Sequence, residues 1–99
     1  MGRSKSRIDE MKYRFAFTSK FKKEYRKLSA KNMEDVDKII QRLLNGEKLE
    51  EKYHDHQLSG TLKNFRDCHI HPDLVLIYKI EEDILLLTAV NIGSHSNLF

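Results

Sequence analysis

The apolar residues near the start of the chain first alternate with more polar ones and then switch to a helical spacing. Tyr13, Phe15 and Phe17 recur at every second residue, which is typical of a strand with one buried face. The next apolar residues recur at i, i+4 and i+7, and they are Phe21, Tyr25 and Leu28. This spacing predicts an amphipathic helix with lysines on its other face, and Ser19 is the residue expected to cap it.

A second amphipathic helix is predicted directly after the first. Its apolar stripe keeps the spacing of one helical face and consists of Val36, Ile39, Ile40, Leu43 and Leu44. Asn32 is the expected N-cap and Gly46 the expected stop, because these residue types favour the two ends of a helix. Two helices joined by a few residues form an antiparallel hairpin. Residues 47–60, which are polar and show no period, are predicted to form a loop.

The second half of the chain contains three apolar segments that predict strands. They cover residues 65–70, 73–80 and 84–90, with a turn at 81–83 and with Gly93 ending the last segment. The segment 73–80 is almost continuously apolar, which is typical of a central strand that is buried on both faces.

This order of elements predicts an α+β fold, with an N-terminal strand and a helical hairpin packed on one face of a mainly antiparallel sheet. Two helices cannot cover both faces, so the other face is expected to be at least partly open. Residues 11–99 are expected to form one domain, as suits a chain of this length. Residues 1–10 carry charges but no apolar segment and are interpreted as a disordered leader or a tag outside the fold.

Basic residues are concentrated in the first predicted helix. The chain has 18 Lys and Arg against 15 Asp and Glu, which gives a net charge of +3. Five of these cations lie close together, and they are Lys20, Lys22, Lys23, Arg26 and Lys27. Such a surface suits a polyanion, and contacts with phosphates would position a nucleic acid without recognising its sequence. A solvated helix face is the alternative interpretation.

The cysteine count and the hydropathy pattern restrict the compartment. The only cysteine is Cys68, so no intrachain disulfide can form and a reducing cytoplasm fits. Cys68 is expected to be buried and structural. No run of 18 apolar residues occurs, which excludes a transmembrane helix, and no membrane partner is expected.

Histidine is confined to the second half of the chain. All five histidines lie between His54 and His95, and imidazole exchanges a proton near neutral pH. His54 with His56, and His69 with His71, form two His-x-His pairs, a pattern that zinc can use. No third ligand follows either pair at a metal-binding spacing, so no metal site is predicted. A surface or structural role is favoured for His54 and His71.

Two further positions combine a polar side chain with the end of a strand. His95 follows a glycine and a serine after the last apolar segment, where a rigid sheet can hold a reactive side chain in place. Asp73 follows Pro72 where the chain re-enters the sheet, and an aspartate there is either a turn residue or a functional one.

Three blocks of sequence resemble the YafQ branch of the RelE/ParE toxin superfamily. The first is Tyr53-His54-Asp55-His56-Gln57-Leu58-Ser59-Gly60. The second is Phe65-Arg66-Asp67-Cys68-His69-Ile70, continued by Pro72-Asp73-Leu74 and Leu76-Ile77-Tyr78. The third is Gly93-Ser94-His95-Ser96, continued by Leu98-Phe99. The blocks keep the order and spacing of the family, and the resemblance runs from about Met11 to Phe99.

The resemblance implies a RelE-like fold and a bacterial, cytoplasmic toxin of a type II toxin–antitoxin system. Such a toxin is a ribosome-dependent mRNA endonuclease that a cognate antitoxin keeps silent. The antitoxin is expected to be of the ribbon-helix-helix DNA-binding type, so operator DNA would be bound only through it. The family's catalytic positions fall on His56, His69, Asp73, His95 and Phe99. No cofactor is implied.

The chemistry of RNA cleavage makes sense of these residue types. When the 2′-hydroxyl attacks the adjacent phosphate, the step needs a base for the hydroxyl, an acid for the departing 5′-oxygen and cations for the developing charge. His95 and His69 are the leading acid–base candidates. His56 and Asp73 would share proton transfer or fix the imidazoles, and Phe99 would stack on a base or shape the site.

One position departs from the family pattern. Members commonly carry an arginine four residues before the histidine of the Gly-Ser-His block, whereas this chain has Asn91. Arg66 or a lysine of the first helix is the expected substitute as a phosphate contact. Two alternatives stay open: a weakened toxin that acts mainly by binding its antitoxin, and a ParE-like gyrase poison, which would not need the histidines.

Overall fold

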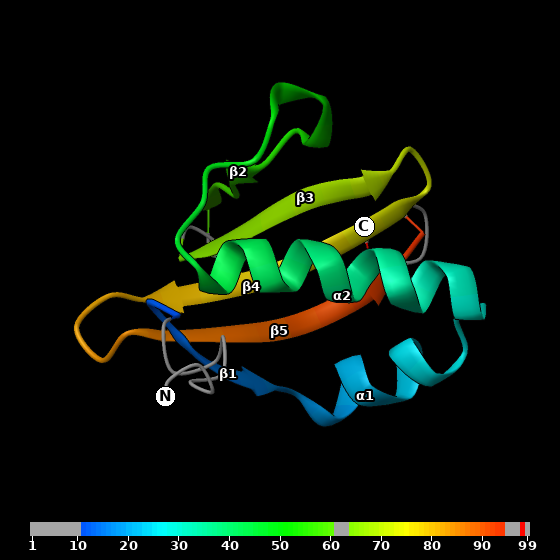
Figure 1. Ribbon diagram of the computed structural model, residues 1–99, viewed down its shortest axis with the longest axis horizontal. Coiled ribbons are helices and arrows are strands. Elements are labelled where there is room, and N and C mark those ends of the chain that lie inside the picture. Colours follow the sequence, from blue (N-terminus) through cyan, green and yellow to red (C-terminus); the bar gives the residue numbers. More distant parts are fainter. Residues whose placement is uncertain (1–10, 61–63, 95–97, 99) are drawn as a thin grey trace, which may run out of the picture.

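The computed structural model describes residues 11–60, 64–94 and 98. They form helices packed against one five-stranded sheet (Figure 1). In chain order these are β1 (Arg14–Phe17), α1 (Ser19–Arg26), α2 (Ala30–Leu44), the 3-10 helix η3 (Glu51–Tyr53), β2 (His56–Gln57), β3 (Phe65–His71), β4 (Leu74–Glu81) and β5 (Leu86–Gly93). The residues 1–10 that were interpreted as a leader or tag lie outside the described residues. No helix in the described ranges is long and apolar enough to cross a membrane.

The sheet has the strand order β1-β5-β4-β3-β2. β1 pairs parallel with β5, and every other pair is antiparallel. Figure 1 shows α2 lying across one face of this sheet, while α1 follows β1 at the edge that is farthest from β2. The predicted α+β architecture with a mainly antiparallel sheet is therefore confirmed.

Both helices begin earlier than their predicted caps. Thr18, not Ser19, caps α1, because its Oγ1 accepts a hydrogen bond from the Phe21 N–H at 3.0 Å. Ser29, not Asn32, caps α2 by accepting the N–H of Asn32 at 3.1 Å. In each case the hydroxyl of an earlier residue accepts a hydrogen bond from an N–H group of the first turn. Residue type alone does not decide which of several nearby Ser, Thr or Asn residues is the cap.

The predicted stop of the second helix is confirmed. α2 ends at Leu44, and Gly46 follows with a φ of +82°. Its N–H donates to the carbonyl of Leu43 at 2.9 Å. This left-handed position after a helix favours glycine because a Cβ would be strained there.

The segment 47–60 is not the plain loop that its lack of period predicts. It contains η3 and the short strand β2, which pairs with β3, and Leu49 is buried in the core. A two-residue strand is too short to show a period, and its pairing comes from β3 rather than from local sequence. The last strand also differs: it begins at Leu86, because Ile84 and Leu85 lie exposed in the preceding turn.

One face of the sheet and α2 enclose the core. The predicted stripe of the second helix is buried, as are Cys68, Ile70, Leu76 and Tyr78 beneath it. In β4, Val75 and Ile77 alternate with these core residues and are also buried, so the prediction of a central strand buried on both faces is confirmed. Side chains alternate between the faces of a strand, so Asp67 and His69, which flank Cys68, lie on the face away from α2; the register shifts between His69 and His71.

Candidate active site

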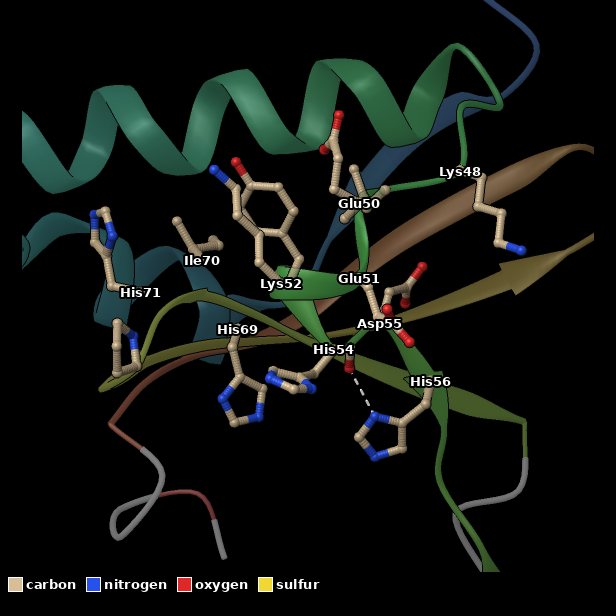
Figure 2. A pocket seen from close by; sticks show the side chains of 13 residues that line it. Lys48, Glu50, Glu51, Lys52, His54, Asp55, His56, His69, Ile70 and His71 are labelled. Carbon is tan, nitrogen blue, oxygen red and sulfur yellow. Dashed lines mark hydrogen bonds between the residues drawn. The ribbon is translucent and has the colours of Figure 1, made fainter.

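The short β2 strand brings the histidines of the loop beside those of β3. An open groove of about 1200 Å³ lies along this edge of the sheet, and its lining includes His54, His56, His69, His71, Lys48 and Lys52. Figure 2 shows His54, His56 and His69 pointing away from α2, whereas His71 lies on the side of α2. The two His-x-His pairs, which lie far apart in the sequence, therefore line one groove.

His69 occupies the open face of β3 by strand alternation. Its neighbours Cys68 and Ile70 are core residues, so its imidazole lies on the opposite face. The ring of His54 approaches it edge-on, with 5.6 Å between the ring centroids. His54 ends η3 with a φ of +49°, an uncommon conformation for a residue with a Cβ. The structure thus places His54 against a predicted catalytic residue.

His56 lies on the same open face, opposite Asp67 in the β2–β3 pairing. Its Nδ1 lies 2.7 Å from the carbonyl oxygen of His54 and 3.1 Å from Oδ1 of Asp67. Because a carbonyl oxygen can only accept, the neutral imidazole carries its proton on Nδ1. The free lone pair is then on Nε2, which is the geometry of a general base that faces solvent.

His71 has a structural contact. Its Nε2 lies 2.7 Å from Oδ2 of Asp35 and so links the end of β3 to α2. The hydrogen bond from His71 holds the pKa of Asp35 below its ordinary value, and Lys31 adds to this effect. The structural role favoured for His71 is supported by this contact.

Three further catalytic predictions are Asp73, His95 and Phe99. Asp73 is exposed in the turn between β3 and β4. His95 and Phe99 lie outside the described residues. The chain reaches His95 from Gly93, which pairs with Val75, and Val75 in turn pairs with His69. Two strand spacings, about 10 Å, therefore separate Gly93 from His69 across the open face.

Arg66 is held on the opposite face of the sheet. Its Nε donates to Oδ1 of Asp55 at 3.3 Å and lies 3.3 Å from the Tyr78 hydroxyl. The Tyr78 hydroxyl also donates to Asp55 at 2.5 Å, and burial raises the pKa of Tyr78. Arg66 pairs with Tyr78 across the strands and so shares its face. The structure does not bring Arg66 together with His56 and His69.

The basic residues of α1 are separated from the histidine groove by the width of the sheet. Lys20, Lys22, Lys23, Arg26 and Lys27 are all exposed, but α1 lies at the β1 edge and the groove at the β2 edge (Figure 1). The cations that line the groove are Lys48 and Lys52. Sequence reasoning missed both, because they stand in a segment without a period and no local pattern marks them.

Asn91 is engaged by α1. Its Nδ2 donates to Oε1 of Glu24 at 3.3 Å, and the same oxygen accepts the backbone N–H of Ile92 at 3.0 Å. β1 pairs with β5 only as far as Ala89, so Glu24 satisfies part of the β5 edge that β1 leaves open. An arginine at position 91 would meet this carboxylate.

Neither a thiol nucleophile nor a metal centre emerges from the described residues. Cys68 is fully buried, and burial raises the pKa of its thiol, so it is not the thiolate that a nucleophile requires. No group of three or more His, Cys, Asp or Glu within residues 11–60 and 64–94 is arranged to hold a metal ion. Histidine acid–base chemistry is what the described groove can perform.

The chain is similar to known bacterial toxins. Residues 13–99 match the family described as a bacterial toxin of type II toxin-antitoxin system, YafQ. The chain is 38% identical over 77 residues to the mRNA interferase toxin YafQ of Escherichia coli strain K12, covering 74% of this chain and 82% of that one. A metal-bound toxin from Helicobacter pylori is 40% identical with a TM-score of 0.76, covering 86% of this chain and 97% of that one. YafQ in the E. coli DinJ-YafQ toxin-antitoxin complex is 28% identical with a TM-score of 0.78, covering 90% and 99%.

Proposed function

Because the chain belongs to the YafQ family of bacterial type II toxins, we propose that it is an mRNA interferase, an endoribonuclease that cuts mRNA on the ribosome. The observation that carries this proposal is the meeting of His56 and His69 on one open face of the sheet. The relative from E. coli that bears the name mRNA interferase supports the same substrate class.

The proposed reaction needs no metal of its own. A base takes the proton of the 2′-hydroxyl, the 2′-oxygen bonds to phosphorus, and the bond from phosphorus to the 5′-oxygen breaks as an acid protonates that oxygen. His69 and His95 are the leading acid–base candidates, and His56, whose side chain is 57% exposed, would share the proton transfer through its Nε2. Asp73 would assist proton transfer or fix an imidazole, and Phe99 would stack on a base.

Cations on two surfaces would contact the RNA. Lys48 and Lys52 line the groove and are placed to meet the phosphate charge near the scissile bond. Lys20, Lys22, Lys23, Arg26 and Lys27 stand at the far edge and would contact phosphates of ribosomal or messenger RNA away from it. Arg66 would act only through its partners Asp55 and Tyr78.

The deciding experiment is induced expression followed by primer extension on a reporter mRNA. The wild-type protein is expected to produce discrete cleavage ends within the translated region, and His69→Ala and His95→Ala to abolish them while the folded proteins accumulate. Growth arrest without new mRNA ends, unchanged by either variant, would contradict the proposed nuclease and favour a different target such as gyrase.

We also propose that a cognate antitoxin of the ribbon-helix-helix type silences the protein and links it to operator DNA. The E. coli relative is found in a complex with DinJ. A second groove, of about 470 Å³, lies between β1, α1 and α2 and is lined by aromatic residues together with Lys22. Phe15 and Phe17 remain 41% and 50% exposed there. The apolar floor with basic α1 beside it fits an amphipathic, acidic antitoxin segment.

A charge placed in this second groove tests the antitoxin contact. Phe17→Glu is expected to weaken antitoxin binding at least about 10-fold, because buried aromatic anchors carry much of an interface's energy. Ile84→Glu is the matched control, since Ile84 is an apolar residue of similar exposure in the β4–β5 turn. Equal binding by both variants, measured by titration with the purified antitoxin, would place the contact elsewhere.

Asn91 favours one further candidate function, that of a weakened toxin that acts mainly by binding its antitoxin. Single-turnover cleavage by Asn91→Arg tests it. An arginine there can hold a phosphate in two contacts, but Glu24 would compete for it, so the double variant Asn91→Arg with Glu24→Gln is the informative one. A large gain in rate would show that the native chain lacks a phosphate contact, and no gain would show that Asn91 does not limit cleavage.

A further inference from the structure

Asp67 is a buried carboxylate on the open face of β3, opposite His56. The residue is only 3% exposed. Within the described part of the chain, Oδ1 has no hydrogen-bond partner. Burying a carboxylate oxygen without a hydrogen bond is unfavourable, and nearly all buried polar groups in folded proteins have one. Such an exception calls for a role outside the resting hydrogen-bond network.

The nearest cation-forming group to this oxygen is the imidazole of His56. Asp67 and His56 face each other across the β2–β3 pairing, and Oδ1 lies 3.1 Å from Nδ1. The Nδ1 proton is directed to the carbonyl oxygen of His54 at 2.7 Å. A small rotation of the half-exposed His56 ring would redirect the same proton to Asp67, so the two acceptors flank one donor.

We propose that Asp67 is a positioning residue that stabilises the protonated form of His56 during RNA cleavage. This inference rests on the proposed nuclease function and adds a role for a residue that sequence reasoning did not single out. Charge-assisted hydrogen bonds are roughly twice as strong as neutral ones. The pair therefore strengthens when His56 becomes an imidazolium, which is the condition for stabilising a transition state rather than the resting enzyme.

The proton balance of the step is simple. His56 starts with its proton on Nδ1 and an empty Nε2. The proton of the 2′-hydroxyl moves to Nε2 as the 2′-oxygen bonds to phosphorus, and the imidazolium so formed keeps its Nδ1 proton between the His54 carbonyl and Asp67. Asp67 stays ionised throughout. The 5′-oxygen leaves with a proton from a second histidine.

The test is Asp67→Asn, which keeps the shape of the side chain but removes its charge. Single-turnover cleavage of ribosome-bound mRNA is expected to slow about 10- to 100-fold, less than the ~10²–10⁴ lost with a general base itself. The ribosome concentration that gives half the maximal rate is expected to stay unchanged, because Asp67 is only 3% exposed and offers almost no surface for an RNA contact. A variant that only damages the fold would lose stability and binding instead.

A double-mutant cycle with His56→Gln separates positioning from structure. If Asp67 acts through His56, Asp67→Asn slows the His56→Gln protein no further, whereas independent effects would add. Asp55→Asn is the matched control: this partly buried aspartate of the same region contacts Arg66 and Tyr78 instead of an imidazole. The substitution is expected to lower stability without coupling to His56.

Full wild-type rate in Asp67→Asn, or additive losses in the double variant, would overturn the inference while the nuclease function stands. Absence of cleavage by the wild-type protein would instead refute the proposed function, so the two failures are distinguishable.

Discussion

The two faces of β3 use the same kinds of residue in opposite ways. On the face toward α2, Arg66 and the Tyr78 hydroxyl meet the carboxylate of Asp55 in a closed network. On the open face, Asp67 keeps an oxygen without a hydrogen bond among the described residues, and His69 borders a groove. The covered face pairs its polar groups and so stabilises the fold, whereas the open face directs imidazoles to the groove.

The largest predicted effect separates catalysis from stability on the open face. His69→Ala is expected to lower single-turnover mRNA cleavage by about 10²–10⁴-fold, the usual loss for a general acid or base. The free energy of unfolding in urea is expected to change little, because the imidazole lies outside the core cluster. A His69→Ala protein with a much lower free energy of unfolding but a normal cleavage rate per folded molecule would contradict this prediction.

The covered face is predicted to respond in the opposite manner. Tyr78→Phe removes a hydroxyl that donates to Asp55 and leaves this partly buried carboxylate with one donor fewer, so the free energy of unfolding is expected to fall by about 1–3 kcal/mol. Cleavage per folded molecule is expected to persist, since Tyr78 faces α2. A lost cleavage rate at unchanged stability would show that the network reaches the active site through β3.

Charge at the two edges of the sheet provides a finer comparison. Changing Lys20, Lys23 and Lys27 to glutamine is expected to flatten the salt dependence of ribosome binding, because each lost phosphate contact reduces the counterion release. The rate at saturating ribosome is expected to hold. Lys48→Gln with Lys52→Gln is the matched variant in the groove and is expected to lower that rate as well. An unchanged salt dependence in the triple variant would identify α1 as a solvated face.

The smallest predicted effect concerns the contact between His71 of β3 and Asp35 of α2. The pKa of Asp35 is lowered, chiefly by His71, so the ionised carboxylate stabilises the fold at pH values above its ordinary pKa of about 3.8. This contribution disappears as pH falls through the lower folded value. The difference in unfolding free energy between wild type and Asp35→Asn is therefore expected to shrink below about pH 4. If the difference in unfolding free energy did not depend on pH, the ion pair between Asp35 and His71 would not be its cause.

The sequence predicted the helical core more successfully than the site. The stripe Val36 to Leu44 repeats one local period, and every such residue is buried, because a helix face is fixed by neighbours three or four residues apart. The caps failed by one and three residues, since several nearby hydroxyls compete for the same N–H groups. β2 was missed because its two residues pair only with a distant strand.

The candidate site shows the same division. The family pattern marked His56 and His69, and the structure brings both to one groove. Arg66 was expected to substitute for the missing arginine as a phosphate contact, but strand alternation places it with Tyr78 on the covered face. Asp67 lies between Arg66 and His69 in the sequence, and no local pattern distinguishes it. Only its burial and its short distance from His56 in the structure identify it as a candidate.

The sequence by itself determined the order of the elements, the core stripe of α2 and the family to which the chain belongs, because each is written in local periods or in ordered blocks of residues. The tertiary structure alone decided which residue faces which side of β3, which cations reach the groove, and where Asp67 meets His56. The physical reason is that strand register is set by pairing between distant segments, and a shift of one residue exchanges the two faces.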